Sequence, residues 1–208
     1  MRHRAARELF DYWNALRGSR PAPERAEIDL AAIRGLIADM FMLEVDAADL
    51  FPFVLSGTRV NALACAEQRG RSFLDLWARQ EQHNVTALLL SVIDSACPLI
   101  AVADAKPAGW QDYEIELLLL PLGRRGQDRT RILGLIAPST PPSWLGLLPV
   151  QDLSLRSVQT IDNAAAPNGF DPEILFKTAP VAPQAKRFGA PLKKVLHLRV
   201  FQGGRHVS

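Results

Sequence analysis

Apolar residues between positions 5 and 17 recur at intervals of three and four, which places them on one face of a predicted helix. The large side chains of this face are Leu9, Tyr12, Trp13 and Leu16. Gly18 ends the helix, and the prolines that follow at positions 21 and 23 favour a turn or an extended linker. Such an apolar stripe must be covered, either by this domain or by another copy of the chain.

A second helix is predicted over residues 30–39, behind a suitable N-cap at Asp29. Its apolar side chains again recur at helical spacing: Ile33, Leu36 and Ile37. Shorter helices are expected over residues 60–66 and 72–77. A longer helix with a broad apolar stripe is expected from about residue 80 to residue 96.

Short apolar stretches bounded by turn residues predict the strands. These stretches are 40–45, 51–58, 99–105, 113–122, 129–137 and 153–161. In the fourth stretch Glu114 and Glu116 alternate with Ile115 and Leu117, which indicates one solvated face and one core face. We therefore expect an antiparallel sheet that is covered on one side, with the two glutamates on its exposed face.

Composition fits a single folded domain with extensions. The chain has 208 residues, of which 48% are hydrophobic, and carries 24 Lys and Arg against 22 Asp and Glu. Residues 28–183 have a net charge of −6, whereas residues 184–208 have six basic side chains and no acidic one. We divide the chain into an N-terminal helix and linker (1–27), a central domain (28–162) and an Ala/Pro-rich basic tail (163–208).

The two cysteines match no disulfide framework, which favours a reducing compartment, and we expect the cytoplasm. The basic N-terminus lacks the apolar core of a secretion signal, and no stretch approaches the ~20 apolar residues that span a bilayer. We expect neither a leader nor a membrane span.

Motifs for catalysis or metal binding are not apparent in the sequence. The glycines of residues 123–126 lack the Lys-Ser/Thr pair of a phosphate-binding loop, and the four histidines show no ligand spacing. We assign no catalytic residue and no metal site, and expect a non-enzymatic protein. Arg124 and Arg125, with the basic tail, are candidates for anion or nucleotide binding, although no nucleic-acid motif accompanies them.

Several short segments resemble one known family when they are taken together. They are residues 9–18 (LFDYWNALRG), 21–25 (PAPER), 28–30 (IDL), 53–58 (FVLSGT) and 70–73 (GRSF). The order of the predicted elements and these segments resemble a bacterial PAS-like family long catalogued as a domain of unknown function. The resemblance spans roughly residues 5–160.

The resemblance implies an α+β fold, namely a five-stranded antiparallel sheet with helices on one face and an N-terminal helical extension. In PAS domains the sheet and the long helix can enclose a pocket for haem, flavin or a small metabolite. The sequence does not identify a cofactor. Cys65 lies outside the flavin-reactive motif, and His83, the one histidine placed to bind haem, stands alone at the polar start of the long helix. Candidate pocket residues are Trp77, Leu89, Ile93, Tyr113 and Leu117. They could instead simply fill the core.

PAS domains often dimerise through the outer sheet face or an N-terminal helix. The aromatic face of residues 5–17 is therefore either a seal over the sheet or a homodimer seam. We expect a sensory or signalling module that acts through ligand-dependent or constitutive protein–protein contacts, with a homodimer or a signalling protein as its partner. The alternatives are a packed interaction module without a ligand and, third, the anion binder.

Overall fold

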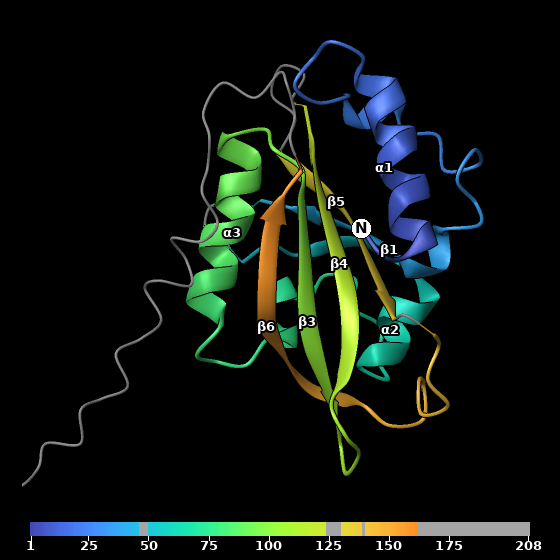
Figure 1. Ribbon diagram of the computed structural model, residues 1–208, viewed down its shortest axis with the longest axis vertical. Coiled ribbons are helices and arrows are strands. Elements are labelled where there is room, and N and C mark those ends of the chain that lie inside the picture. The colour runs from blue at the N-terminus through green and yellow to red at the C-terminus, as the bar shows by residue number, and fades with distance from the viewer. Residues whose placement is uncertain (46–49, 124–129, 139, 162–208) are drawn as a thin grey trace, which may run out of the picture.

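One antiparallel sheet of six strands organises the protein, and its spatial order is β2-β1-β5-β4-β3-β6 (Figure 1). The computed structural model describes residues 1–45, 50–123, 130–138 and 140–161. The strands are β1 (Met40–Glu44), β2 (Phe53–Ser56), β3 (Leu99–Pro107), β4 (Tyr113–Leu122), β5 (Arg131–Pro138) and β6 (Val150–Thr160). The predicted stretches therefore identify all six, and the sixth strand exceeds the five that the family resemblance implied.

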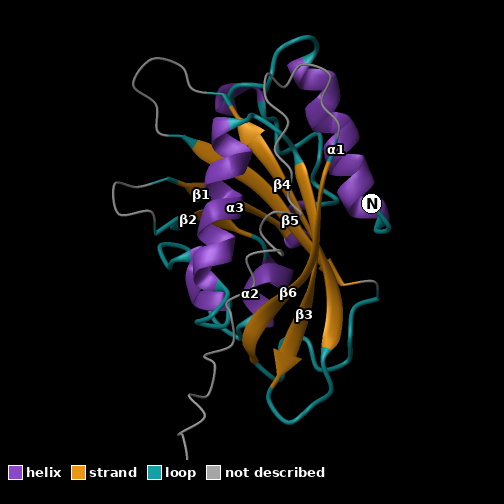
Figure 2. Cartoon of the chain, turned by 60° about the vertical axis from the view of Figure 1, so that its left-hand side comes forward, coloured by secondary structure: helices purple, strands orange, loops and turns teal. Residues whose placement is uncertain are grey.

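Three α-helices and three short 3₁₀ turns complete the described part of the chain. The α-helices are α1 (Arg4–Arg17), α2 (Thr58–Leu63) and α3 (Gln82–Asp94). The 3₁₀ turns are η1 (Arg25–Glu27), η2 (Ile37–Asp39) and η3 (Phe73–Leu76). In Figures 1 and 2, α1 and α3 lie on opposite sides of the sheet.

Strands β4 and β5 are buried on both faces, so the prediction of a sheet that is covered on one side only is wrong. Strand β4 sends Leu117 and Leu119 into the core beneath α3, and Leu118 and Leu120 into a second core beneath α1. The alternation of glutamate with apolar residues is confined to the start of β4, because every position from 115 to 122 is buried. A strand covered on both faces is a nearly continuous apolar run.

Helix α1 seals the second face. Leu9 and Trp13 are fully buried against the sheet, and the indole Nε1 of Trp13 donates to the Pro121 carbonyl at 2.8 Å. Gly18 takes a left-handed φ of 57° just beyond the helix, and its N–H donates to Asn14 O. The predicted start, face and end of this helix are confirmed to within one residue.

The predicted helix over residues 30–39 is wrong, because this segment forms successive tight turns that end in η2. The N–H groups of Leu36 and Asp39 each bond to the carbonyl three residues earlier. Asp29 does accept from the Ala31 N–H, but it caps only a turn. Gly35 costs about 1 kcal/mol of helix propensity, and the turns suffice to bury Ile33 and Leu36 beside α1.

Replacing Trp13 tests the seal. Trp13→Phe removes a buried donor and leaves the Pro121 carbonyl without its partner, so the free energy of unfolding should fall by about 1–3 kcal/mol. Trp110→Phe is the matched control, since Trp110 is 55% exposed and should change stability by less than about 0.5 kcal/mol. Chemical denaturation of both variants measures the difference, and equal effects would contradict the role given to α1.

Candidate functional site

The core between α3 and the sheet is the first candidate site, because it collects the residues predicted to line a pocket. Trp77, Leu89 and Leu117 are at most 3% exposed, and Ile93 and Tyr113 are half-buried beside them. All five thus belong to one apolar cluster. Three elements supply them: Trp77 follows η3, Leu89 and Ile93 lie on α3, and the other two lie on β4.

Aromatic rings fill the part of this core that lies next to β1. Phe41 of β1, Phe53 of β2 and Phe73 of η3 pack with ring centroids 5.3–5.7 Å apart, and Trp77 lies 5.8 Å from Phe73. The three phenylalanines are at most 1% exposed. None of the three was predicted as a site residue, although an aromatic residue in each of the predicted segments 40–45, 51–58 and 72–77 was a usable signal.

Gly134 of β5 makes this ring packing possible. It pairs with Phe41 across the two strands, and a Cβ at position 134 would overlap the Phe41 ring. Glycine inside a strand often marks such a close approach. The glycine therefore fixes where the Phe41 ring lies.

The opposite end of the same core holds two buried donors without partners among the described residues: the indole Nε1 atoms of Trp77 and Trp144. Trp144 packs edge-on against Tyr113, with ring centroids 6.0 Å apart. Trp77 forms a bridge with Leu153 of β6, and Leu153 and Tyr113 both pair with the same residue of β3. Trp144, in the connection between β5 and β6, was not predicted as a site residue.

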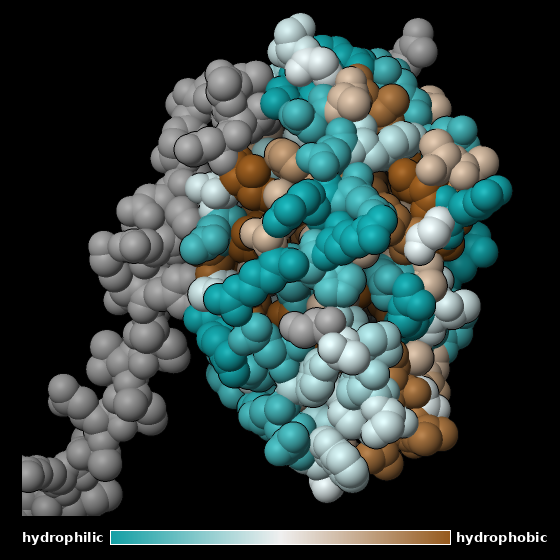
Figure 3. All heavy atoms as spheres, turned by 45° about the vertical axis from the view of Figure 1, so that its right-hand side comes forward, coloured by the Kyte–Doolittle hydropathy of each residue, from teal (hydrophilic) through white to brown (hydrophobic). Residues whose placement is uncertain are grey.

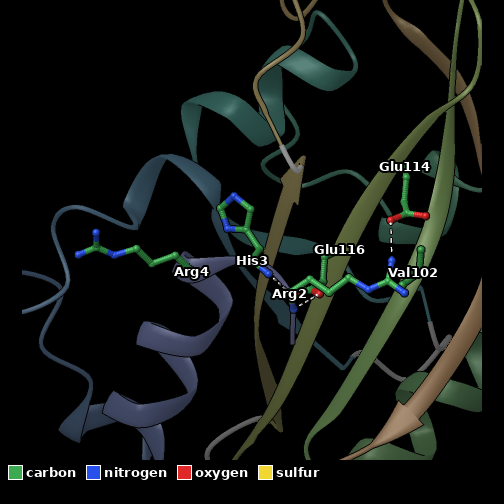
Figure 4. Close-up of a pocket in the computed structure, with 6 residues that line it drawn as sticks. All are labelled: Arg2, His3, Arg4, Val102, Glu114 and Glu116. Carbon is green, nitrogen blue, oxygen red and sulfur yellow. Dashed lines mark hydrogen bonds and ion pairs between the residues drawn. The ribbon is translucent and has the colours of Figure 1, made fainter.

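The outer face of the sheet carries a second, charged candidate site, formed where the N-terminal residues cross β4 (Figure 4). Glu116 is only 8% exposed, and its carboxylate accepts the backbone N–H groups of Arg2 (2.7 Å) and His3 (3.1 Å). Both bonds join the chain's first residues to the sheet. The cavity beside them has a volume of about 230 Å³.

Charged side chains continue from this point across β3, β4 and β6. The Arg2 guanidinium donates to Glu114 at 3.2 Å, and Arg156 of β6 donates to both Glu114 and Asp104. The predicted solvated face of Glu114 and Glu116 is therefore a salt-bridge network partly covered by the N-terminus. Arginine side chains pair with Asp104 and Glu114, and backbone N–H groups bind Glu116.

A second cavity, of about 360 Å³, opens between the end of α3 and the N-terminal linker. Ile93 lines it, together with Pro21, Ala22 and Leu122. One predicted pocket residue therefore faces this surface cavity as well as the core.

The exposed apolar residues Trp110 and Leu147 lie elsewhere, in neighbouring loops joined by the bond from Ala108 N to Pro149 O. The face shown in Figure 3 is mostly hydrophilic, with hydrophobic atoms also gathered at its lower end.

The residues predicted for an interface divide into two pairs. Leu9 and Trp13 are buried within their own chain, so they present no surface to a partner. Tyr12 and Leu16 stay partly exposed at the rim of α1, and the Tyr12 hydroxyl accepts the Asp29 N–H at 2.8 Å. Arg124, Arg125 and the basic tail lie outside the described residues.

Two ion pairs hold the segments that lead into the sheet. The Arg20 guanidinium, together with the Glu24 N–H, lowers the pKa of Glu27, and the Glu27 carboxylate raises the pKa of Arg20 in return. Arg59 of α2 binds the buried Asp39 carboxylate with two nitrogens, and this bond chiefly raises the pKa of Arg59. Both pairs fix the chain: one joins Arg20 to Glu27, and the other joins α2 to η2.

Comparison with known proteins identifies the class. The model of the PAS domain family matches residues 1–137, so the chain belongs to the PAS domain family. Among solved structures, it is similar to the PAS domain of a protein from Colwellia psychrerythraea, at 12% identity and a TM-score of 0.39, over 53% of this chain and 97% of that one. No curated protein matches the chain.

The described residues include neither a metal-binding cluster nor a helix that could span a membrane. Within residues 1–45, 50–123, 130–138 and 140–161, no group of three or more His, Cys, Asp or Glu side chains could hold a metal ion. No helix in that part of the chain is long and apolar enough to cross a membrane.

Filling the space above Gly134 tests the packing of the aromatic core. Gly134→Ala should lower the free energy of unfolding by about 1–3 kcal/mol or more, because the new methyl group must displace the Phe41 ring. Phe41→Leu makes room for that methyl group, so the loss in the double variant should be smaller than the sum of the two single losses. A double-mutant cycle measured by denaturation checks this. Simple additivity would contradict the contact.

Proposed function

We propose that this PAS protein is a non-enzymatic signalling module in the cytoplasm that acts through constitutive protein–protein contacts. The observation that carries the proposal is the ring packing of Phe41, Phe53, Phe73 and Trp77 on the inner face of the sheet. In this arrangement side chains of the protein itself occupy space that a bound cofactor would need. The protein then signals through contacts that its surface makes with other proteins, and not through a ligand bound in its core.

The electrostatics support the same proposal. The outer sheet face pairs Asp104 and Glu114 with Arg156, and Arg2 with Glu114, so its acids are already engaged. An acid or base that served in catalysis would need a free partner in a cleft and a poised pKa. The described acids of this face hold the chain together instead.

A second candidate function, small-ligand sensing, is favoured by the indole N–H groups of Trp77 and Trp144. A buried donor without a partner costs about 1–3 kcal/mol, and a ligand with hydrogen-bond acceptors would recover that energy. Tyr113 packs beside Trp144 and completes an aromatic wall at this end of the core. Such a ligand would lie between Trp77, which follows η3, and Trp144 in the connection from β5 to β6.

Native mass spectrometry of the full chain, with an absorption spectrum of the same sample, separates the two candidates. We expect a mass that is a whole multiple of the bare chain and no absorption beyond that of the aromatic residues. The matched variants are Trp77→Phe and Trp144→Phe, which keep a ring and remove the donor. A retained small molecule that both variants lose would overturn the proposal and establish the ligand-sensing function.

A further inference from the structure

The two edges of the sheet differ, and this difference points to an interaction surface. Edge strand β2 is covered, because the Phe53 N–H donates to Arg71 O at 3.0 Å and its carbonyl accepts the Gly70 N–H at 2.8 Å. At the other edge β6 lies beside β3 and has no further strand beyond it among the described residues (Figure 1). An uncovered edge presents backbone groups that can pair with another strand.

Among the described residues, backbone hydrogen bonds from outside the sheet cover only the first half of the β6 edge. The Ala78 N–H donates to the outward carbonyl of Leu153 at 3.0 Å, next to the bridge from Trp77. Further along, the Ile161 N–H donates inward to Pro98 O at 2.9 Å. Because backbone groups alternate along a strand, Gln159 also faces β3, and Val158 and Thr160 direct their N–H and C=O groups outward.

Helix α3 packs on β4 and β5, and η3 contacts the covered half of β6. No backbone hydrogen bond from a described helix reaches the outward groups of this second half. The outward backbone groups of Val158 and Thr160 have no hydrogen-bond partner among the described residues. The open edge therefore consists of the residues around Val158, Gln159 and Thr160.

The open edge also lacks the features that usually protect an edge strand. Residues 157–160 include no charge and no proline. The nearest charged side chain is Arg156, which is held by Asp104 and Glu114 on the outer face. Arg156 lies at the point where the β3–β6 register shifts, so regular pairing along this edge starts after it.

We propose that a second copy of this chain pairs with this edge, β6 against β6 in the antiparallel sense, so that one sheet continues through both subunits. The proposal rests on the proposed function and names the partner as another copy. A two-fold axis at Gln159 sets Val158 opposite Thr160 of the partner subunit, so that outward groups meet outward groups. The register keeps the uncharged residues 157–161 facing one another and brings no like charges together, as an isologous interface requires.

The register makes Gln159 the test position. Its side chain is exposed, and in this pairing it lies directly opposite Gln159 of the partner subunit, at a non-hydrogen-bonded pair where side chains approach most closely. Gln159→Lys and Gln159→Glu should each weaken the dimer by about fivefold or more in Kd, because each places like charges opposite one another. An equimolar mixture of the two variants should form the dimer again, now as a heterodimer.

Thr160 gives a second, backbone-level test. Thr160→Pro removes an outward N–H from each subunit and should weaken the dimer by more than about tenfold, whereas Thr160→Ala keeps that N–H and should leave Kd nearly unchanged. Sedimentation velocity over a concentration series measures all four variants, and circular dichroism confirms that each one is folded.

Each outcome bears on the pairing by itself. A monomeric wild-type chain, or a dimer that neither Gln159→Lys nor Thr160→Pro weakens, overturns the β6 pairing. A monomer in which the Val158 and Thr160 amides resist hydrogen exchange also overturns it, since another part of the same chain then covers the edge. A retained ligand in the native mass spectrum refutes the packed-core function but leaves the dimer result to stand or fall separately.

Discussion

Strands β4 and β5 bury side chains on both faces, and this constraint governs the arrangement of the rest of the molecule. A sheet with two apolar faces needs two covering layers. Helix α3 with η3 covers one face, and α1 covers the other, anchored by the bond from Trp13 to the Pro121 carbonyl. The N-terminal helix is thereby an integral part of the core, consistent with a family match that begins at residue 1.

The position of α1 also explains the buried carboxylate on the outer face. The residues just before α1 cross β4, and there the backbone N–H groups of Arg2 and His3 bind Glu116. A carboxylate on a buried strand costs energy unless it is hydrogen-bonded, and these two donors supply that bonding. The charged row of Glu114, Asp104 and Arg156 then continues over the part of the sheet that α1 leaves uncovered.

Aromatic rings fill the inner core, and part of the β6 edge has no hydrogen-bond partner among the described residues. Phe41, Phe53 and Phe73 occupy the inner face, with Gly134 leaving room for the first ring. Backbone groups at a sheet edge can provide strong and directional contacts to another strand. The sixth strand, beyond the five that the family resemblance implied, is the element that creates this edge.

The sequence by itself determined the elements with strong local signals. The spacing of Leu9 and Trp13, the glycine that ends α1 and the apolar runs of the strands are local properties, and they predicted this helix and the six strands correctly. The family was predicted from the resemblance of short segments such as residues 9–18 and 53–58, and the family match confirms it. The helix predicted over residues 30–39 was wrong, because tight turns bury Ile33 and Leu36 as well as a helix would.

Only the tertiary structure decided what each face contacts. Glu116 has the pattern of a solvated position. Its burial depends on the backbone of Arg2 and His3, which precede it in the sequence by 114 and 113 positions. The pairing of Gly134 with Phe41 and the meeting of Trp77, Tyr113 and Trp144 are likewise contacts between distant segments. Local periodicity indicates which side chains share a face of a helix or strand. Whether that face is covered, and by which residues, is set by how the helices and strands pack together.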